Sequence, residues 1–477
     1  MTLVAGVDSS TQATKVAVVR VEDGEVVARG RAPHPPRGAG LARETDPQAW
    51  WQALGEALEQ TQLAGQVAAL SVAAQQHGLV LTDDRGDAVR PAILWNDTRS
   101  AQVHDELLAA AGGAEAWATR VGSVPPPAFT VSSWVWLRRT EPQAVKRAQA
   151  VMLPHDYLTY RLTGRIVTDR GDASGTGWWS TASGSYDEEI LGLPLVALSG
   201  MSLPTVLGPR EAAGPVLEGA AAQLGLSADC TVGPGTGDNM AAALALALEP
   251  GEAAISLGTS GTVYTKSTRR PADPTGVVSG FADADGDYLP LACTLNCTQA
   301  VDRAASWLGL DREDIAPQTD VVVLPYLDGE RTPHLPHASG AAVGLRHDTT
   351  RESLLRAVYE GAAASLVEAL DTVIAIAGVD EEPAGGAVIV IGGGARGAGW
   401  QDVLGTLTGR ALLIPDEDEL VALGAAVQAA AVLTGEPLMA IARRWDKRRG
   451  RELPARPRDD GRLEAVRSAR EQIFGVR

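Results

Sequence analysis

The 477-residue sequence contains few cysteines and no long apolar run. Its three cysteines, Cys230, Cys293 and Cys297, have neither the spacing of a metal site nor the number of a disulfide framework, so we expect core residues in a reducing, cytoplasmic setting. No window of about 18 apolar residues occurs, and the N-terminus lacks a basic, apolar leader. The sequence therefore predicts neither a membrane span nor a targeting segment.

Positive charge is also scarce. Lys and Arg number 41 against 59 Asp and Glu, giving a net charge of −18, which argues against a protein that binds nucleic acid or an anionic membrane. Hydrophobic residues make up 45% of the chain, and its length indicates two domains with sizeable cores. We expect small-molecule partners, with a homodimer as the open possibility for assembly.

The scarcity of lysine excludes one way of binding ATP. None of the four lysines follows a glycine, whereas a Walker A loop needs Gly-Lys-[Ser/Thr] so that the lysine reaches the β and γ phosphates. If the protein binds ATP, it must do so through another kind of loop.

The first third of the chain predicts a mixed sheet covered by helices. Strands are expected over 3–7, 15–21 and 25–31, and a buried strand over 67–74. Between them, Asp46 and Pro47 begin a helix. The adjacent Trp50 and Trp51 cannot both face inward from one helix stripe, so we expect one in the core and the other partly exposed or at a domain contact.

The opening strand and turn have a counterpart later in the chain. Residues 6–11 and 254–259 both join an apolar strand to a turn of small residues that ends in threonine, which suggests two domains of like topology. A capping box at Thr349 and Glu352 begins a long buried helix that ends before Gly378. We place the boundaries at 1–245, 246–442 and a charged C-terminal extension, 443–477, the first boundary following an apolar helix over 240–248.

Asp8 follows the first strand beside Ser9, Ser10 and Thr11. Hydroxyls and backbone N–H groups in such a turn suit phosphate oxygens, and the carboxylate suits Mg²⁺ through water. Taken alone, the segment favours a plain Asp-Ser turn. A second turn of this kind, over 256–262 with Gly258 and Thr259, favours two phosphate loops closing on one nucleotide.

Three glycines, at positions 233, 235 and 237, directly precede Asp238, which stands at or near the start of a helix. An aspartate before a helix is usually an N-cap, but an N-cap alone does not require several glycines in the preceding turn. An aspartate in such an opening can accept a hydroxyl proton while the oxygen attacks a phosphorus atom in line. We therefore take Asp238 as a candidate general base.

The segment from Gly392 to Gly397 matches G-x-G-x-x-G after a strand, with Asp416 about 20 residues later. By pattern this is a dinucleotide fingerprint, and a nicotinamide-dependent oxidoreductase is one alternative. An actin-like module that hydrolyses ATP slowly is another. Against the oxidoreductase, the remaining chain is too short for a second half and a substrate domain, and adenosine can lie over the same glycine turn in a kinase.

Together these segments resemble the FGGY-type carbohydrate kinases of the actin-like ATPase superfamily, and most closely the xylulokinase group. The resemblance runs from about residue 4 to residue 435. It is carried by segments in the same order: Gly6–Lys15, Gln76–Gly78, Pro91–Asp97, Leu153–Leu158, Gly237–Asn239, Ser256–Gly261, Leu324–His334 and Gly392–Arg396.

The resemblance implies two ribonuclease-H-like domains, α/β with mixed sheets flanked by helices, the first binding sugar and the second nucleotide, with the active site in the cleft between them. It implies transfer of the γ-phosphoryl group of ATP to the 5-hydroxyl of D-xylulose; another pentulose or polyol is the alternative. It implies that Asp238 is the general base and that Asp8 holds Mg²⁺ through water. The implied sugar ligands are Gln76, His77, Trp95, Asp238 and Asn239. The implied nucleotide ligands are Asp8, Thr11, Gly258, Thr259, Gly392, Gly393, Gly394 and Ala395.

Two of these positions have competing interpretations. A histidine after a strand is often a packed residue, although the strand end and the neighbouring Gly78 favour a sugar ligand for His77. Some xylulokinases have methionine where Gln76 stands, and an amide in place of a thioether changes the hydrogen bonds a pocket offers to a sugar.

Overall fold

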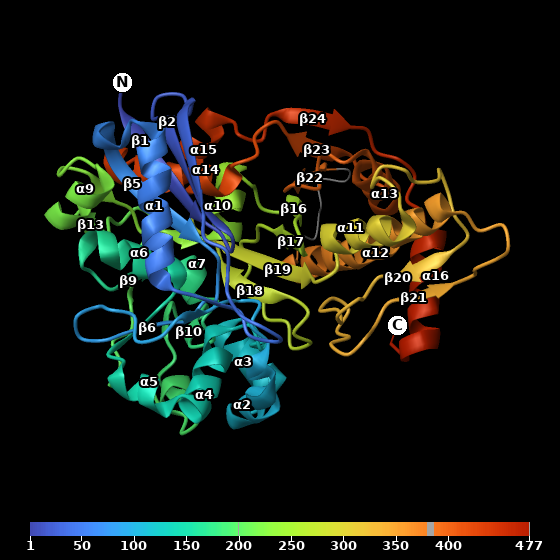
Figure 1. The fold of residues 1–477 in the computed structure, drawn as a ribbon, viewed down its shortest axis with the longest axis horizontal. Helices are drawn as coiled ribbons and strands as arrows, with labels where there is room; N and C mark the ends of the chain where they lie inside the picture. The colour runs from blue at the N-terminus through green and yellow to red at the C-terminus, as the bar shows by residue number, and fades with distance from the viewer. Residues whose placement is uncertain (199, 379–385, 477) are drawn as a thin grey trace. The chain divides into compact units, whose positions relative to one another are not determined.

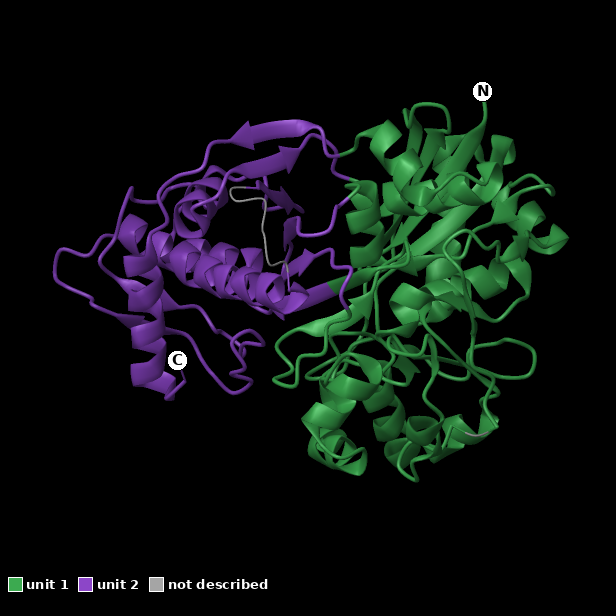
Figure 2. Cartoon of the chain, turned by 180° about the vertical axis from the view of Figure 1, so that it is seen from behind, with its two compact units in different colours: residues 1–247, 270–289, 419–447 green, residues 248–269, 290–418, 448–477 purple. Residues whose placement is uncertain are grey.

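The computed structural model describes residues 1–198, 200–378 and 386–476 (Figure 1). The chain divides into two compact units, each assembled from three separate stretches (Figure 2). Unit 1 comprises residues 1–247, 270–289 and 419–447, and unit 2 comprises 248–269, 290–418 and 448–477. The expected architecture of two α/β units with mixed sheets is confirmed. The division at 245 and 442 into contiguous domains stays a prediction.

Unit 1 is built on a mixed sheet in the order β13-β14-β5-β1-β2-β3, with β15 extending the edge of β5. The first three strands form an antiparallel meander in which residues 21–25 link β2 to β3, and β5 returns parallel to β1. Their bounds are β1 Leu3–Ser9, β2 Ala13–Arg20, β3 Val26–Pro33, β5 Val67–Ala74, β13 Gly214–Pro215, β14 Thr231–Val232 and β15 Thr236–Gly237.

Helices from distant parts of the chain cover this sheet. Helix α14 (Leu420–Thr434) packs on β1 and β5 although both strands lie in the first 74 residues of the chain (Figure 1). The packing needs glycine, because a Cβ at Gly6 would lie 1.7 Å from the backbone oxygen of Ala422. The other helices of unit 1 are α1 Pro47–Thr61, α2 His104–Ala110, α3 Ala114–Val121, α4 Thr130–Thr140, α5 Pro142–Arg147, α6 Pro154–Thr163, α7 Arg170–Ala173, α8 Glu188–Gly192, α9 Glu218–Leu224, α10 Asp238–Ala245 and α15 Leu438–Trp445.

Short strands complete unit 1. They are β4 Glu44–Thr45, β6 Val80–Thr82, β7 Ala92–Ile93, β8 Ala150–Met152, β9 Val167–Asp169, β10 Trp179–Ser180, β11 Ser185–Tyr186, β12 Thr205–Leu207 and β18 Ser279–Ala282. Among the described residues, none of the helices of the protein is long and apolar enough to cross a membrane.

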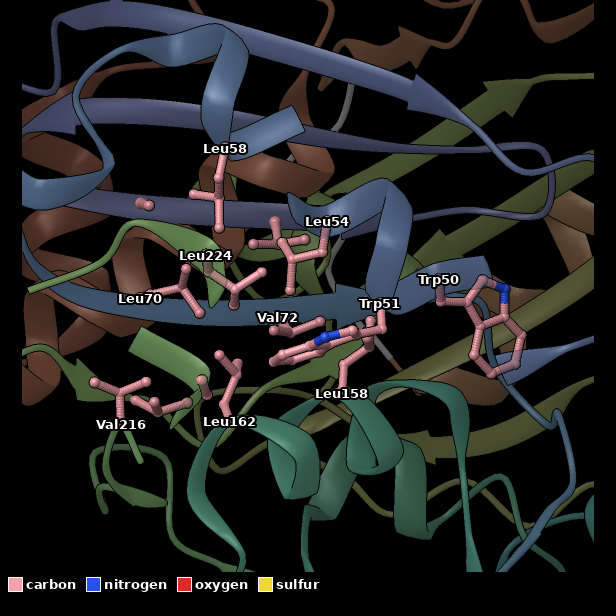
Figure 3. Close-up of a cluster of buried hydrophobic side chains, with 14 of the residues drawn as sticks. Trp50, Trp51, Leu54, Leu58, Leu70, Val72, Leu158, Leu162, Val216 and Leu224 are labelled. Atoms are coloured by element: carbon pink, nitrogen blue, oxygen red, sulfur yellow. The ribbon is translucent and has the colours of Figure 1, made fainter. Parts of the chain in front are cut away.

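A large core cluster of unit 1 lies between α1, the sheet, α6 and α9 (Figure 3). The expectation that Trp50 or Trp51 is partly exposed is wrong, since both are buried. Helix α1 contacts β2 and β3 as well as α6 and α9, so more of its surface is buried than a single row of side chains. Trp51 donates its indole N–H to Gln223 and lies under Arg161, while Trp50 packs edge-on against Tyr157.

Unit 2 repeats the topology of unit 1, as the recurring strand and turn predicted. Its sheet has the order β19-β17-β16-β22-β23-β24; β16 is antiparallel to β17 and parallel to β22, just as β1 is to β2 and β5. The strands are β16 Ala253–Leu257, β17 Gly261–Thr265, β19 Tyr288–Thr294, β20 Val322–Leu324, β21 Ala341–Val343, β22 Val388–Ile391, β23 Leu412–Pro415 and β24 Gly450–Leu453.

The helices of unit 2 are α11 Thr298–Leu308, α12 Arg351–Ala377, α13 Ala398–Thr408 and α16 Asp460–Phe474. The long helix α12 ends as expected at Gly378, which is left-handed. Its start differs by one residue from the expectation, because the hydroxyl of Thr350, not of Thr349, accepts the N–H of Ser353 and caps the helix.

Candidate active site

The fold gathers most of the predicted sugar-site residues at one edge of the sheet of unit 1. Parallel strands β1, β5 and β15 end together there, with Ser9 opposite Ala74 and Gly237 opposite Ala74. Asp8 is the second-last residue of β1, Gln76 and His77 follow β5, and Asp238 follows β15. The carboxyl ends of parallel strands are where α/β proteins place their ligands.

Asp8 is 4% exposed, and its carboxylate faces a cation on the neighbouring strand. Lys15 stands directly opposite Asp8 in the β1–β2 register, and its Nζ lies 3.5 Å from Asp8 Oδ2 and 3.1 Å from Glu419 Oε2. Burial raises the pKa of the Asp8 carboxyl to about 6, although Lys15 acts in the opposite direction. Neither Lys15 nor Glu419 was predicted as a site residue; Glu419 directly precedes α14 and is far from Asp8 in the sequence.

The surroundings of Asp8 fit a hydrated divalent cation. Asp8 Oδ1 is buried and accepts no hydrogen bond from any described residue, so one hard oxygen donor is left over. Within the described part of the chain, no three His, Cys, Asp or Glu side chains converge as a metal cage. Mg²⁺ bound with nucleotide needs only one or two carboxylates, because water and phosphate oxygens supply the remaining ligands.

Asp238 opens helix α10 but does not cap it. The N-cap residue is Gly237, and Asp238 Oδ1 accepts the backbone N–H of Asn239 at 2.8 Å and its side-chain Nδ2 at 2.9 Å. Burial, reinforced by the nearby Asp8 carboxylate, raises the pKa of Asp238 to about 7. A carboxylate with this pKa is suited to accept a proton near neutral pH.

Gln76 and His77 each form a hydrogen bond with another residue of unit 1. The Oε1 atom of Gln76 accepts Asn239 Nδ2 at 3.3 Å. His77 has a positive φ of 65°, its Nδ1 donates to the carbonyl oxygen of Gly175 at 2.8 Å, and its ring stacks on Phe129 at 4.5 Å. With Nδ1 protonated, Nε2 is the acceptor nitrogen of the neutral ring.

Trp95 and Thr11 lie in contact, although the resemblance implied different ligands for them. The indole N–H of Trp95 donates to Thr11 Oγ1 at 3.0 Å, and Thr11 donates to Gln75 Oε1 at 3.4 Å. Both residues are half-buried. The hydroxyl of Thr11 is therefore oriented by Trp95, a relationship that no local sequence pattern contains.

In unit 2, the two predicted nucleotide turns meet at the ends of adjacent parallel strands. Ser256 of β16 stands opposite Ile391 of β22, so the turn at Gly258 and the turn at Gly392 leave the sheet side by side. Gly394 donates its N–H to the oxygen of Leu257, while the backbone and hydroxyl of Thr298 donate to the oxygen of Gly258 at 3.1 and 2.7 Å.

The glycines of the second turn serve different purposes. Gly392 has φ +86°, and a Cβ there would lie 2.8 Å from Leu257 oxygen; a Cβ on Gly394 would meet Leu257 and Thr298 at the same distance. Gly393 is exposed, and a Cβ on it would meet nothing within 4 Å. Ala395 is buried, with its oxygen accepting Gln401 Nε2 at 2.7 Å. Only Gly393 keeps open space beside it.

The predicted residues thus form two clusters, one on each unit. Asp8, Thr11, Gln76, His77, Trp95, Asp238 and Asn239 belong to unit 1, while Gly258, Thr259 and residues 392–395 belong to unit 2. Their roles as ligands, and an active site shared by the two units, stay predictions.

Comparison with known proteins identifies the family of the chain's relatives. Residues 3–245 match the N-terminal domain, and residues 253–433 the C-terminal domain, of the FGGY family of carbohydrate kinases. Xylulose kinases of Streptomyces coelicolor and Streptomyces rubiginosus are 57% and 56% identical over 465 residues, 97% of this chain and 95% of each relative. The crystal structure of xylulose kinase from Bifidobacterium adolescentis matches with a TM-score of 0.82 at 35% identity, covering 98% of this chain and 99% of that one.

Proposed function

Because the chain belongs to the FGGY family of carbohydrate kinases, we propose that it transfers the γ-phosphoryl group of ATP to the 5-hydroxyl of D-xylulose. The products are D-xylulose 5-phosphate and ADP. The choice of sugar follows the relatives that are 56–57% identical and named xylulose kinases. Membership in this family removes the oxidoreductase alternative, whose only support was the glycine pattern from Gly392.

The single observation that carries the proposal is the relation of Asp238 to Asp8. Two carboxylates at one sheet edge have different surroundings: Asp8 faces the Lys15 cation, whereas Asp238 accepts two N–H groups of Asn239 and lies near the negative charges of Asp8 and Asp172. The pKa of Asp238 is consequently the higher of the two, about 7 against about 6. This difference supports Asp238 as the general base and Asp8 as the carboxylate that stays charged beside the metal ion.

In the proposed reaction, Asp238 takes the proton of the sugar hydroxyl as that oxygen attacks the γ-phosphorus. The O–H bond breaks, a new P–O bond forms, and the bond between the γ-phosphorus and the β–γ bridging oxygen breaks, releasing ADP. His77 and Asn239 orient the sugar, while Thr11 and the turns at Gly258 and Gly392 hold the nucleotide. When bound, Mg²⁺ would neutralise phosphate charge, with Asp8 holding it through water.

The first test is a coupled assay of ADP release over a panel of pentuloses, glycerol and gluconate. We expect D-xylulose to give the highest kcat/KM. A different pentulose or polyol in first place would overturn the sugar assignment and leave the kinase assignment intact. If no polyol raises ADP release above the sugar-free background, the chain is not acting as a sugar kinase.

The second test addresses the base. We expect Asp238→Ala to keep sugar and nucleotide binding measurable by calorimetry while turnover falls at least about a hundredfold, the scale of a lost general base. Near-normal turnover would remove Asp238 from this role.

Location and assembly complete the proposal. Cys230 and Cys297 are buried and not disulfide-bonded, which fits the reducing cytoplasm, whereas Cys293, expected in the core, is half-buried. The homodimer stays a prediction, and light scattering across a range of protein concentrations tests it.

A further inference from the structure

Helix α14 carries a buried amide in an otherwise apolar run. From Leu420 to Ala431, Gln428 is the one polar side chain of the helix, and it is fully buried. Taking an amide out of water costs free energy unless its donor and its acceptor both find partners. A glutamine at this position therefore needs a specific pair of hydrogen bonds.

The partners of Gln428 lie on β5 and in the turn that precedes Asp238. Its Nε2 donates to the carbonyl oxygen of Gly235 at 3.0 Å, and its Oε1 accepts the hydroxyl of Ser71 at 3.1 Å. The same Ser71 Oγ accepts the backbone N–H of Gly235 at 3.2 Å. Donors and acceptors agree around the three residues, so both backbone polar groups of Gly235 are bonded to side chains.

These side chains act where the ladder of the sheet is interrupted. Strand β14 ends opposite Leu70 of β5, whereas β15 begins opposite Ala73. The three residues 233–235 therefore span only two positions of β5, and the parallel ladder breaks there. Gly235, which has a φ of +80°, bonds through its N–H and C=O to side chains rather than to a neighbouring strand.

The turn that is fixed in this way leads directly to the predicted base. Only the two residues of β15 separate Gly235 from Asp238, so a shift of the turn is carried to the carboxylate along a short extended stretch. The hydrogen bonds of Asp238 Oδ1 come from Asn239, its immediate neighbour. Those bonds orient the carboxylate locally, but they do not fix the turn on the sheet.

Close packing holds the helix that presents the amide. Helix α14 packs against β5 and α10 (Figure 1). A Cβ on Gly424, one turn before Gln428, would lie 1.8 Å from the carbonyl oxygen of Ala241 in α10. Two helix backbones approach this closely only where the side chain is absent, and such close-packed contacts are rigid. The amide of Gln428 is therefore held at a fixed position beside the turn.

We propose that Gln428 is a positioning residue for the general base, because its amide and the Ser71 hydroxyl together fix the turn that leads to Asp238. An amide suits this task, since one group supplies both a donor and an acceptor. An apolar side chain of similar size would supply neither and would leave the buried carbonyl of Gly235 without its donor. The inference rests on the proposed function and adds a residue of α14 to those that place its base.

A double-mutant cycle with the base tests this role. Gln428→Leu and Asp238→Ala are made singly and together, and kcat, the KM for D-xylulose and the KM for ATP are measured for each. With Asp238 present, we expect Gln428→Leu to lower kcat about tenfold, the scale of one hydrogen bond. The ATP KM should change less than twofold, because the predicted nucleotide turns do not contact Gln428.

In the Asp238→Ala background, turnover is measured with enzyme in excess over sugar. The same Gln428→Leu change should lower it less than twofold, since no base remains to be positioned. An unchanged kcat in the first background, or an equal fall in both, would overturn the proposal. If Gln428→Leu does not fold, Ser71→Ala takes its place in the cycle with the same expectations, because it removes the other side chain that bonds Gly235.

A matched control separates positioning from the loss of a buried hydrogen bond as such. Trp134 of α4 is 1% exposed and donates its indole N–H to the carbonyl oxygen of Val196 at 2.7 Å, and α4 carries none of the predicted ligands. We expect Trp134→Phe to lower the melting temperature and to leave kcat within twofold. A wild-type protein without sugar-dependent ADP release would overturn the proposed function itself, whereas an active wild type with an additive cycle overturns only the positioning role.

Discussion

Lys15 and Asp8 stand opposite each other in the β1–β2 ladder, with Lys15 Nζ 3.5 Å from Asp8 Oδ2. The cation also lies 3.1 Å from Glu419 Oε2, so it separates two carboxylates that would otherwise repel each other. Its position leaves the other oxygen of Asp8 buried without a donor among the described residues. The strand pairing thus decides which oxygen of Asp8 can serve a hydrated cation.

Replacing this lysine should destabilise the protein in a pH-dependent way. We expect Lys15→Met to lower the free energy of unfolding by about 2 kcal/mol at pH 8, where the Asp8 carboxylate is charged and loses its cation. At pH 5, below the pKa of about 6 for Asp8, the loss should be smaller because that carboxyl is protonated. Denaturant unfolding at both pH values measures the difference, and exposed Lys146→Met is the control. An equal loss at both pH values would contradict the ion-pair explanation.

The raised pKa of Asp238 predicts that this carboxylate opposes folding at neutral pH. Its folded pKa of about 7 lies above the ordinary aspartate value of 3.8, so the native state binds the extra proton and stability falls as pH rises from about 4 to 7. We expect Asp238→Asn to stabilise the protein at pH 8 by on the order of 2 kcal/mol and to have little effect at pH 4. Melting temperatures at the two pH values test this, and a variant less stable at pH 8 would refute it.

Gly393 offers a test of the nucleotide turn. A Cβ at this exposed position meets nothing in the protein, so Gly393→Ala should fold with an unchanged melting temperature. If nucleotide occupies that space, we expect the KM for ATP to rise at least about fivefold, the scale of one displaced contact, with the sugar KM unchanged. Gly219→Ala, equally open and within α9, is the control. An unaltered ATP KM would remove this turn from the nucleotide site.

Trp95 should act on the nucleotide through Thr11. Trp95→Phe removes the N–H that orients the Thr11 hydroxyl, and we expect the KM for ATP to rise about three- to tenfold. Thr11→Val should have a similar effect, and the double variant should be no worse than the more affected single one. Exposed Trp307→Phe in α11 is the control. A rise in the sugar KM alone would instead support the sugar contact that the resemblance implied.

Much of the fold could be predicted because it depends on local patterns. The alternation of β2, the apolar run of β5 and the Asp46-Pro47 helix start are each written in a few neighbouring residues. The recurrence of strand and turn at Gly6 and Ala254 likewise predicted the shared topology. The predictions failed where several elements cover one helix, as at Trp51, or where two adjacent threonines compete to cap one, as at Thr349 and Thr350.

By itself the sequence determined the elements, the two-part α/β organisation and the set of candidate ligands, because strand ends, glycine turns and capping residues act over a few positions along the chain. Only the tertiary structure decided how those ligands are held. Lys15 beside Asp8, Trp95 beside Thr11 and Gln428 beside Gly235 are contacts between segments that strand register and packing bring together. Burial then sets their charges, since the removal of water acts on a carboxyl group only after the fold has closed around it.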